Sequence, residues 1–198
     1  MDINSFINPP GFTTGILVVT LAWLGYLSWY DIQKGERPPH AAWVLAPFVI
    51  AVAIRLLAGG YSLAALATAA LVVSNRKQMA ERCRRLASGI GIAIVILSTL
   101  ASLPSHPTGT LAMLAFWLSW ELAPEFIGGA DALVSMTLFL LWPQYGLLIA
   151  ILAGHLLATL GLLAWDGYRK RKLTLMHRIP GMPVLAVSVV FFALLYLR

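Results

Sequence analysis

Eight apolar stretches, separated by short polar breaks, make up most of this chain and limit what it can fold into. They lie at about residues 13–30, 41–58, 60–74, 87–103, 108–123, 131–143, 145–165 and 182–197. Of the 198 residues, 60% are apolar and 11% are charged, whereas an ordinary soluble domain is about 45–50% apolar and ~25% charged. A membrane-crossing helix takes ~20 residues, so eight crossings would use nearly the whole chain. We predict an all-α, polytopic membrane helical bundle of about eight transmembrane helices, forming a single domain over residues 1–198.

The placement of lysine and arginine predicts the orientation of this bundle. The basic residues gather after the first, third and seventh stretches: Lys34, Arg37, Arg76, Lys77, Arg82, Arg84, Arg85, Arg169, Lys170, Arg171, Lys172 and Arg178. Basic residues on short loops stay in the cytoplasm, so both termini should face outward. Arg55 and Arg198 lie at predicted outer helix ends, where long cationic side chains can reach the lipid headgroups. Membrane topology thus accounts for the formal net charge of +6, and we expect no nucleic-acid partner.

Two aspartates stand at predicted membrane boundaries, where a carboxylate is costly and usually functional. Asp31 ends the first apolar stretch, and Asp131 opens the sixth after Gly128, Gly129 and Ala130. Four crossings would separate them, and an even number returns the chain to the same, cytoplasmic side. Two carboxylates that share a site do not both ionise readily, so one can hold a proton while the other polarises a water molecule. Such a pair hydrolyses peptide bonds, but the two aspartates could instead be independent helix-end charges solvated by headgroup water.

Other hydrolytic and metal-binding patterns are missing from the sequence. There is no HExxH motif of a zinc peptidase and no GxSxG motif of a serine hydrolase. Cys83 is the only cysteine, which excludes intramolecular disulfides and cysteine-rich zinc modules. The spacing of the four histidines suggests no metal site. We therefore expect neither a metal nor another cofactor.

Three segments carry motifs in a definite order. The first runs from Asp31 to Pro38, the second is Gly128-Gly129-Ala130-Asp131, and the third is the stretch IPGMPVLA at 179–186. Together they resemble the type IV prepilin peptidases, including the archaeal preflagellin peptidases, which are membrane aspartyl proteases with a GxGD motif. The resemblance implies that Asp31 and Asp131 are catalytic. It implies supporting roles for the other motif positions, namely Gly128, Gly129, Ala130, Pro38, Pro180 and Pro183.

The function implied by this resemblance is aspartic endopeptidase activity at the cytoplasmic face of a prokaryotic cell membrane. The substrate would be a type IV prepilin-like or preflagellin-like precursor, cleaved after its short basic leader peptide. The cysteine-rich module and N-methyltransferase region of the larger bacterial members are absent from this sequence, so we expect no methyltransferase activity. The separation of the two aspartates is longer than usual in the family, which fits an additional helical hairpin at 86–123.

Some residues depart from the family pattern and keep a second interpretation open. Arg37, Pro38 and Pro39 replace the usual Ile-Pro-Asn, and Leu133 replaces a lysine two positions after the second aspartate. The alternative is a non-enzymatic membrane protein. It would be either a catalytically degenerate relative that scaffolds pilus assembly or a small ion-coupled transporter with both aspartates on the ion path.

A basic leader needs an acidic surface, and three glutamates lie near the predicted cytoplasmic mouth. They are Glu36, Glu121 and Glu125. We predict that they attract the leader, a long-range interaction that salt screens. The alternative is that all three are solvated helix-end charges.

Overall fold

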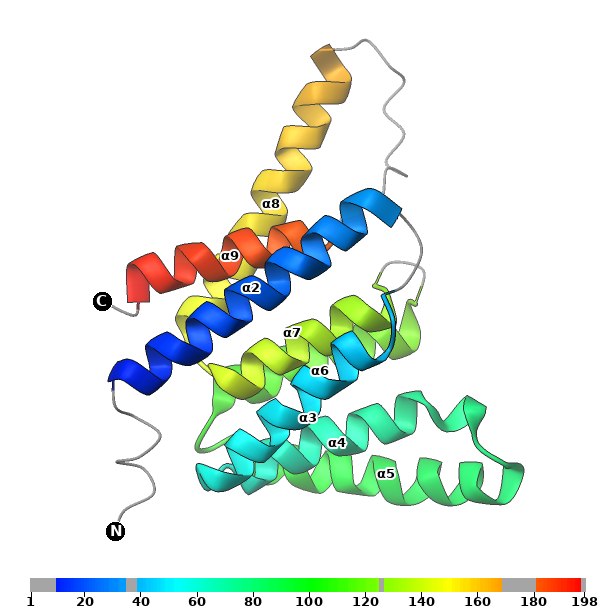
Figure 1. Ribbon diagram of the computed structural model, residues 1–198. Coiled ribbons are helices and arrows are strands. Elements are labelled where there is room, and N and C mark those ends of the chain that lie inside the picture. The colour runs from blue at the N-terminus through cyan, green and yellow to red at the C-terminus, as the bar shows by residue number, and fades with distance from the viewer. Residues whose placement is uncertain (1–9, 35–38, 125–126, 169–180, 197–198) are drawn as a thin grey trace. The chain divides into compact units, whose positions relative to one another are not determined.

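The computed structural model describes residues 10–34, 39–124, 127–168 and 181–196. Within these ranges the chain is all-α, with eight α-helices, one short 3-10 helix and no strand. The elements are α2 (Pro10–Lys34), α3 (Ala42–Leu57), α4 (Tyr61–Ser74), η1 (Arg76–Gln78), α5 (Glu81–Ser102), α6 (Pro107–Leu122), α7 (Gly129–Leu141), α8 (Tyr145–Tyr168) and α9 (Gly181–Tyr196) (Figure 1).

Each predicted apolar stretch corresponds to one of these helices, so the all-α prediction is confirmed for the described residues. Two segments, Thr14–Lys34 and Glu81–Ser102, are long and apolar enough to cross a membrane. The shorter apolar helices are Ala42–Leu57, Tyr61–Ser74, Gly129–Leu141, Tyr145–Gly161 and Gly181–Leu195. The protein is therefore α-helical with two candidate membrane spans, and the count of eight crossings stays a prediction.

The helices form two compact units. The first unit contains α3 to α7, and the second contains α2, α8 and α9. Asp131 belongs to the first unit and Asp31 to the second. The segment 86–123, predicted as an additional hairpin, contributes most of α5 and all of α6 to the first unit.

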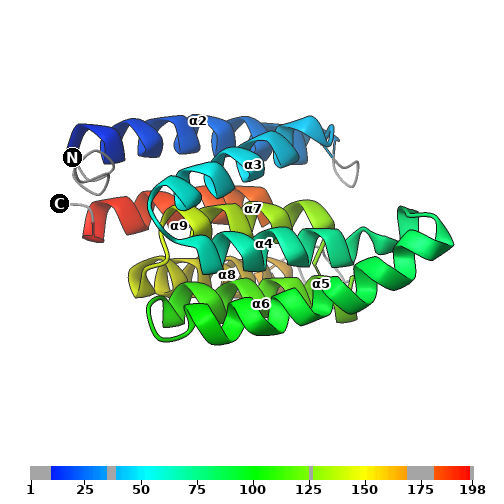
Figure 2. The ribbon, with the colours of Figure 1, turned by 90° about the horizontal axis from the view of Figure 1, so that it is seen from below.

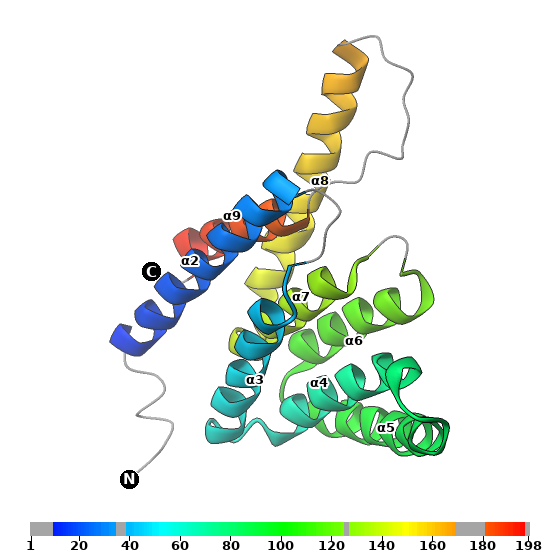
Figure 3. The ribbon, with the colours of Figure 1, turned by 45° about the vertical axis from the view of Figure 1, so that its right-hand side comes forward.

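In the first unit, α4 and α5 lie side by side along their length (Figure 3). Small residues lie at this contact: a Cβ atom on Gly91 of α5 would be 3.9 Å from the carbonyl oxygen of Ala69 on α4. A Cβ atom at Gly91 of α5 would lie 2.5 Å from Cγ2 of Val73, so only glycine fits there. Small residues that let two backbones approach are typical of helix packing in membranes.

The start of α5 differs from the prediction. The apolar stretch begins at residue 87, but the helix begins at Glu81 and includes basic residues that were assigned to the cytoplasmic loop. Arg85 Nη2 donates to Glu81 Oε1 at 3.1 Å, a pairing four residues apart that stabilises a helix. Glu81 also suits the positive end of the helix dipole. Apolar patterning therefore missed the polar first turn, and Cys83 lies exposed on α5.

Helix α7 is the centre of the first unit and packs against α3, α4 and α6. Every residue from 132 to 140 is buried. With 13 residues, the helix is about 20 Å long, which is shorter than a ~30 Å hydrocarbon core. Nine consecutive buried positions include every face of a helix, so residues 132–140 present no apolar face to lipid.

In the second unit, α2 and α9 pack side by side and run antiparallel (Figures 1 and 2). The buried residues of α2 are Thr20, Leu24 and Leu27, spaced by four and three positions along one helix face. Asp31 follows Leu27 by four residues and continues this face into the last turn of α2. The end of α2 that carries Asp31 therefore lies at the same end of the pair as the start of α9.

His106, which precedes α6, provides a test of the fold by pH. Partial burial and then the positive charge of Arg55 lower the pKa of His106 below its ordinary value of about 6.5. The unfolded chain therefore binds this proton more readily, and protonation favours unfolding. We expect the melting temperature in detergent to fall as the pH drops below about 6.5, and to fall less in His106→Gln. Parallel pH profiles for the two proteins would contradict this assignment.

Candidate functional site

Asp131 lies in the first turn of α7, as the sequence predicted. The positive end of the helix dipole favours a carboxylate at this position. Gly128 precedes the helix with φ −66° and ψ 149°, an extended conformation open to any residue. The next residue, Gly129, makes a close approach: a Cβ atom there would lie 3.1 Å from the indole of Trp120, a tight contact. Gly129 thus lets Trp120 of α6 pack closely against the helix that carries Asp131.

The surroundings of this turn come from α4, η1 and α6. Trp117 Nε1 donates to Ser74 Oγ at 3.0 Å, which joins α6 to the end of α4. Arg76 forms an ion pair with Glu121 and donates from Nη1 to the carbonyl oxygen of Val73 at 2.7 Å. The end of α4, the end of α6 and the start of α7 therefore share one end of the first unit.

Glu121, a predicted leader-binding residue, is therefore already partnered. Its side chain is 19% exposed and that of Arg76 is 24% exposed, so both carboxylate and guanidinium remain within reach of water. A basic residue of a leader would have to compete with Arg76 for this carboxylate. Local sequence patterns do not predict this pair, because 45 positions separate the two residues and charge alone does not select one partner among many.

Asp31 is half-buried in the last turn of α2. The helix continues to Lys34, one turn beyond the predicted boundary. Tyr26 stacks at a tilt against Trp29 and Tyr30, with ring centroids 6.1 and 6.5 Å apart. This end of α2 is therefore rich in aromatic side chains, as is common where a helix leaves the hydrocarbon.

The remaining predicted positions fall into three groups. Ala130 follows Gly129 on α7 and is half-buried. Glu36, Glu125, Pro38 and Pro180 lie outside the described residues. Leu133, which stands where the family has lysine, is buried at 7% exposure within the first unit. No cation is therefore supplied from position 133.

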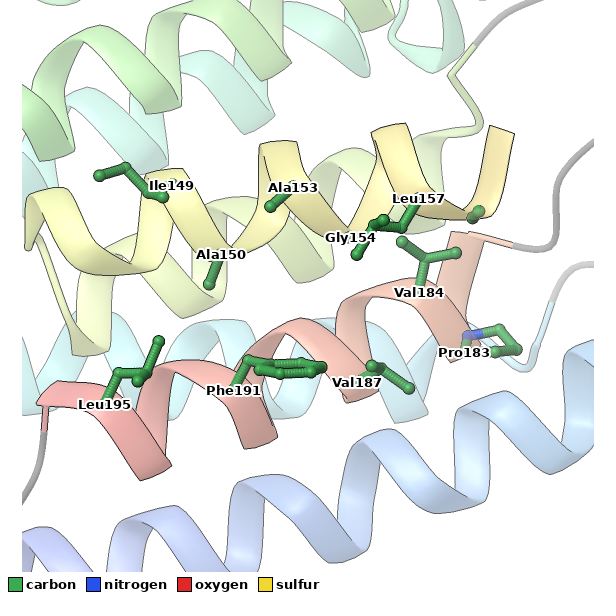
Figure 4. A pocket seen from close by; sticks show the side chains of 11 residues that line it. Ile149, Ala150, Ala153, Gly154, Leu157, Pro183, Val184, Val187, Phe191 and Leu195 are labelled. Atoms are coloured by element: carbon green, nitrogen blue, oxygen red, sulfur yellow. The ribbon is translucent and has the colours of Figure 1, made fainter. Parts of the chain in front are cut away.

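Pro183 lines an apolar groove of about 500 Å³ between α8 and α9. Figure 4 shows the two helices approaching near Gly154 and Val184, where a Cβ atom on Gly154 would lie 2.3 Å from Ser188 Oγ. The groove is lined by apolar residues and glycine only. It offers no acid, base or nucleophile, so it is not a catalytic centre.

In the described residues, Asp31 and Asp131 at helix ends remain the candidate site. No group of three or more histidine, cysteine, aspartate or glutamate side chains gathers there as a metal site would require. Asp131 lies near the end of α6 that carries Trp120 and Glu121. Asp31 lies at the end of the buried face of α2. Comparison with protein-family models, curated proteins and solved structures gives no match to this chain.

Proposed function

We propose that this protein is a multi-pass membrane aspartic endopeptidase that removes the basic leader of a prepilin-like or preflagellin-like precursor at the cytoplasmic face. The observation that carries the proposal is the position of the two aspartates, one at the C-terminal end of its helix and the other at the N-terminal end. Asp31 is in the last turn of α2 and Asp131 in the first turn of α7. Four helices, α3 to α6, lie between them in the chain, so alternating crossings return both acids to one side.

Contacts within the first unit support an alternating direction of its five helices, α3 to α7. At one end, Arg76 after α4 pairs with Glu121 on α6, and Trp120 on α6 lies against Gly129 on α7. At the other end, Arg55 on α3 binds carbonyl oxygens at the end of α7, and Gly109 on α6 lies against Pro143. The basic segment 76–85 and Asp131 thus belong to the same end, which the positive-inside rule assigns to the cytoplasm.

Exposed apolar surface supports a multi-pass arrangement. Large apolar side chains are exposed on every α-helix of the described part except α7. On α5 alone they include Ile90, Ile94, Leu97 and Leu100, each at least 40% exposed. Soluble monomers rarely expose contiguous apolar patches of more than a few hundred Å². A lipid environment would cover these faces without a further protein partner.

The helix ends also suggest a division of labour between the two acids. Asp31 lies at the negative end of the α2 dipole, and Asp131 lies at the positive end of the α7 dipole, which suits a carboxylate. Asp131 would then accept a proton from the attacking water, while protonated Asp31 donates a hydrogen bond to the scissile carbonyl oxygen. The carbonyl carbon gains the water oxygen, and the leaving nitrogen takes a proton as the peptide bond breaks.

The proposal requires the two acids to meet, and a crosslink tests this directly. In a Cys83→Ser background, cysteines at positions 31 and 131 should react with a short bifunctional thiol reagent within one molecule. A matched pair with one cysteine at position 31 and the other at Ser105, after α5, should not crosslink, since Ser105 belongs to the outer end. Failure of the first pair across reagents of increasing length would reject the dyad, and cleavage of a prepilin-like substrate by the purified protein tests the activity itself.

A scaffold or ion-coupled transporter remains the second candidate. It is favoured by the departures from the family pattern, above all the buried apolar side chain of Leu133 in place of lysine. Uptake of protons into vesicles that depends on Asp31 and Asp131, with no cleavage of precursor, would select the transporter. Binding of precursor without cleavage or transport would select the scaffold.

Two changes at the proposed leader site should shift the KM for a basic-leader substrate in opposite directions. Replacing Glu36, Glu121 and Glu125 together by glutamine should raise the KM for a basic-leader substrate by about threefold to 150-fold, because the three exposed ion pairs would contribute about 0.2–1 kcal/mol each. Arg76→Gln should instead lower that KM, because it releases Glu121 from its ion pair. A substrate whose leader lysines and arginines are replaced by glutamine is the control. Equal effects on both substrates would remove these glutamates from recognition.

A further inference from the structure

The end of α7 opposite to Asp131 is held by an arginine. Arg55, in the last turn of α3, donates from Nε to the carbonyl oxygen of Leu140 at 2.7 Å and from Nη2 to that of Leu141 at 3.1 Å. Nη2 also contacts the Leu140 oxygen. The last carbonyl groups of a helix have no partner within the helix, and a cation there is stabilised by the helix dipole. The position of Arg55 at a helix end predicts a side chain that reaches the headgroups, but its guanidinium binds the neighbouring helix instead.

The turn after α3 is shaped around this side chain. Gly59 has φ +77°, a left-handed conformation that suits glycine, and the N–H of Gly60 donates to the carbonyl oxygen of Arg55 at 2.8 Å. A Cβ atom on Gly60 would lie 2.2 Å from Cδ and 2.8 Å from Cγ of Arg55. The Gly59-Gly60 pair therefore makes room for the aliphatic stem of Arg55 and directs its head toward α7.

Helix α7 can transmit a displacement from its Arg55-bound end to the end that carries Asp131. Its residues 132–140 are buried without interruption, and close-packed interiors transmit displacement because they contain few voids. Asp131 and Leu140 are nine residues apart, or about 14 Å along the helix axis. At the Asp131 end the helix meets the indole of Trp120 against Gly129. Shifting the carbonyl end along the axis would shift Asp131 by a similar amount.

We infer that Arg55 is a positioning residue for Asp131, because it fixes the end of α7 to α3 and so sets the depth at which the carboxylate is presented. Its effect on catalysis rests on the proposed function, whereas its effect on the depth of α7 does not. Arg55 touches neither Asp131 nor a substrate position. It acts through the backbone of α7 and is therefore distinct from the catalytic pair.

The depth of α7 can be measured without any peptidase activity. In a Cys83→Ser background, Ala130→Cys places a thiol next to Asp131, and its reaction rate with a water-soluble maleimide reports exposure at that level. Arg55→Met should change this rate several-fold. Arg55→Lys keeps the charge but loses the two-pronged donor geometry, so it should give an intermediate change. Gly60→Ala keeps the arginine but displaces its stem, so it should resemble Arg55→Met; Arg85→Met, at an exposed ion pair on α5, should have no effect.

The enzyme assay provides a separate readout. If Asp131 moves by about 1 Å, kcat should fall by about a hundredfold, while the KM for precursor should stay nearly constant. If Arg55→Met and Gly60→Ala both melt at the wild-type temperature and both show an unchanged labelling rate at position 130, the inference is overturned. If Arg55→Met does not fold, Arg55→Lys and Gly60→Ala decide by the same measurement. If the wild-type protein cleaves no precursor, the proposed function fails, but the labelling rates still decide the role of Arg55.

Discussion

Asp31→Asn and Asp131→Asn should each lower kcat for a prepilin-like substrate by about 10²- to 10⁴-fold, the usual contribution of a positioned general acid or base. Asparagine keeps the size of the side chain but can neither accept the water proton nor share one. The two groups act on the same step, so the double variant should be little worse than either single variant. Rates measured on purified protein in detergent, with melting temperatures alongside, separate lost chemistry from lost folding.

The matched control for this pair is Glu81→Gln. Glu81 is an acid in the first turn of a helix, as Asp131 is, but it is exposed and paired with Arg85 on α5. Its neutralisation should leave the cleavage rate unchanged. Full activity in either aspartate variant, or losses that multiply in the double variant, would show that the two carboxylates do not act as a dyad.

Cys83 should react with an impermeant thiol reagent only after the cell is opened. It is exposed near the start of α5, among basic residues that the positive-inside rule assigns to the cytoplasm. A membrane barrier makes this an all-or-none difference. Labelling of intact and opened cells, followed by mass analysis of the purified protein, measures it.

A second cysteine at the far end of the same helix provides the internal comparison. Ser105 is exposed just beyond α5, and the 22 residues of α5 span about 33 Å. Ser105→Cys in a Cys83→Ser background should therefore label in intact cells. The reverse pattern would invert the orientation, and labelling of both sites in intact cells would mean that α5 does not cross.

Apolar patterning identified the number and order of the helices in the described residues, because burial and lipid both demand continuous apolar stretches. It was less accurate at polar helix turns, as at Glu81 and Lys34, where i,i+4 pairing and the dipole extend a helix beyond its apolar part. It placed Asp131 at a helix start because the glycines before it mark a break. The same signals gave both ends of α2 and α7 to within a turn.

Long-range partners were beyond the reach of local patterns. Arg55 could be assigned to a helix end, but not to the carbonyl oxygens of a helix 85 residues away. The signal that was present is the Gly59-Gly60 pair, which indicates a turn with unusual space requirements. Likewise the motif at Gly129 gave no sign that Trp120 of α6 packs closely against it. Such contacts depend on how whole helices associate.

The burial of residues 132–140 of α7 has a consequence for how the protein is made. Its three packing partners, α3, α4 and α6, all precede it in the chain. When α7 emerges from the ribosome, the three helices against which it packs have already been synthesised. A nascent chain arrested before residue 129 would expose the apolar surface of α3, α4 and α6 that α7 covers in the finished chain. Assembly of the unit that contains Asp131 can therefore be completed during translation by its own last helix.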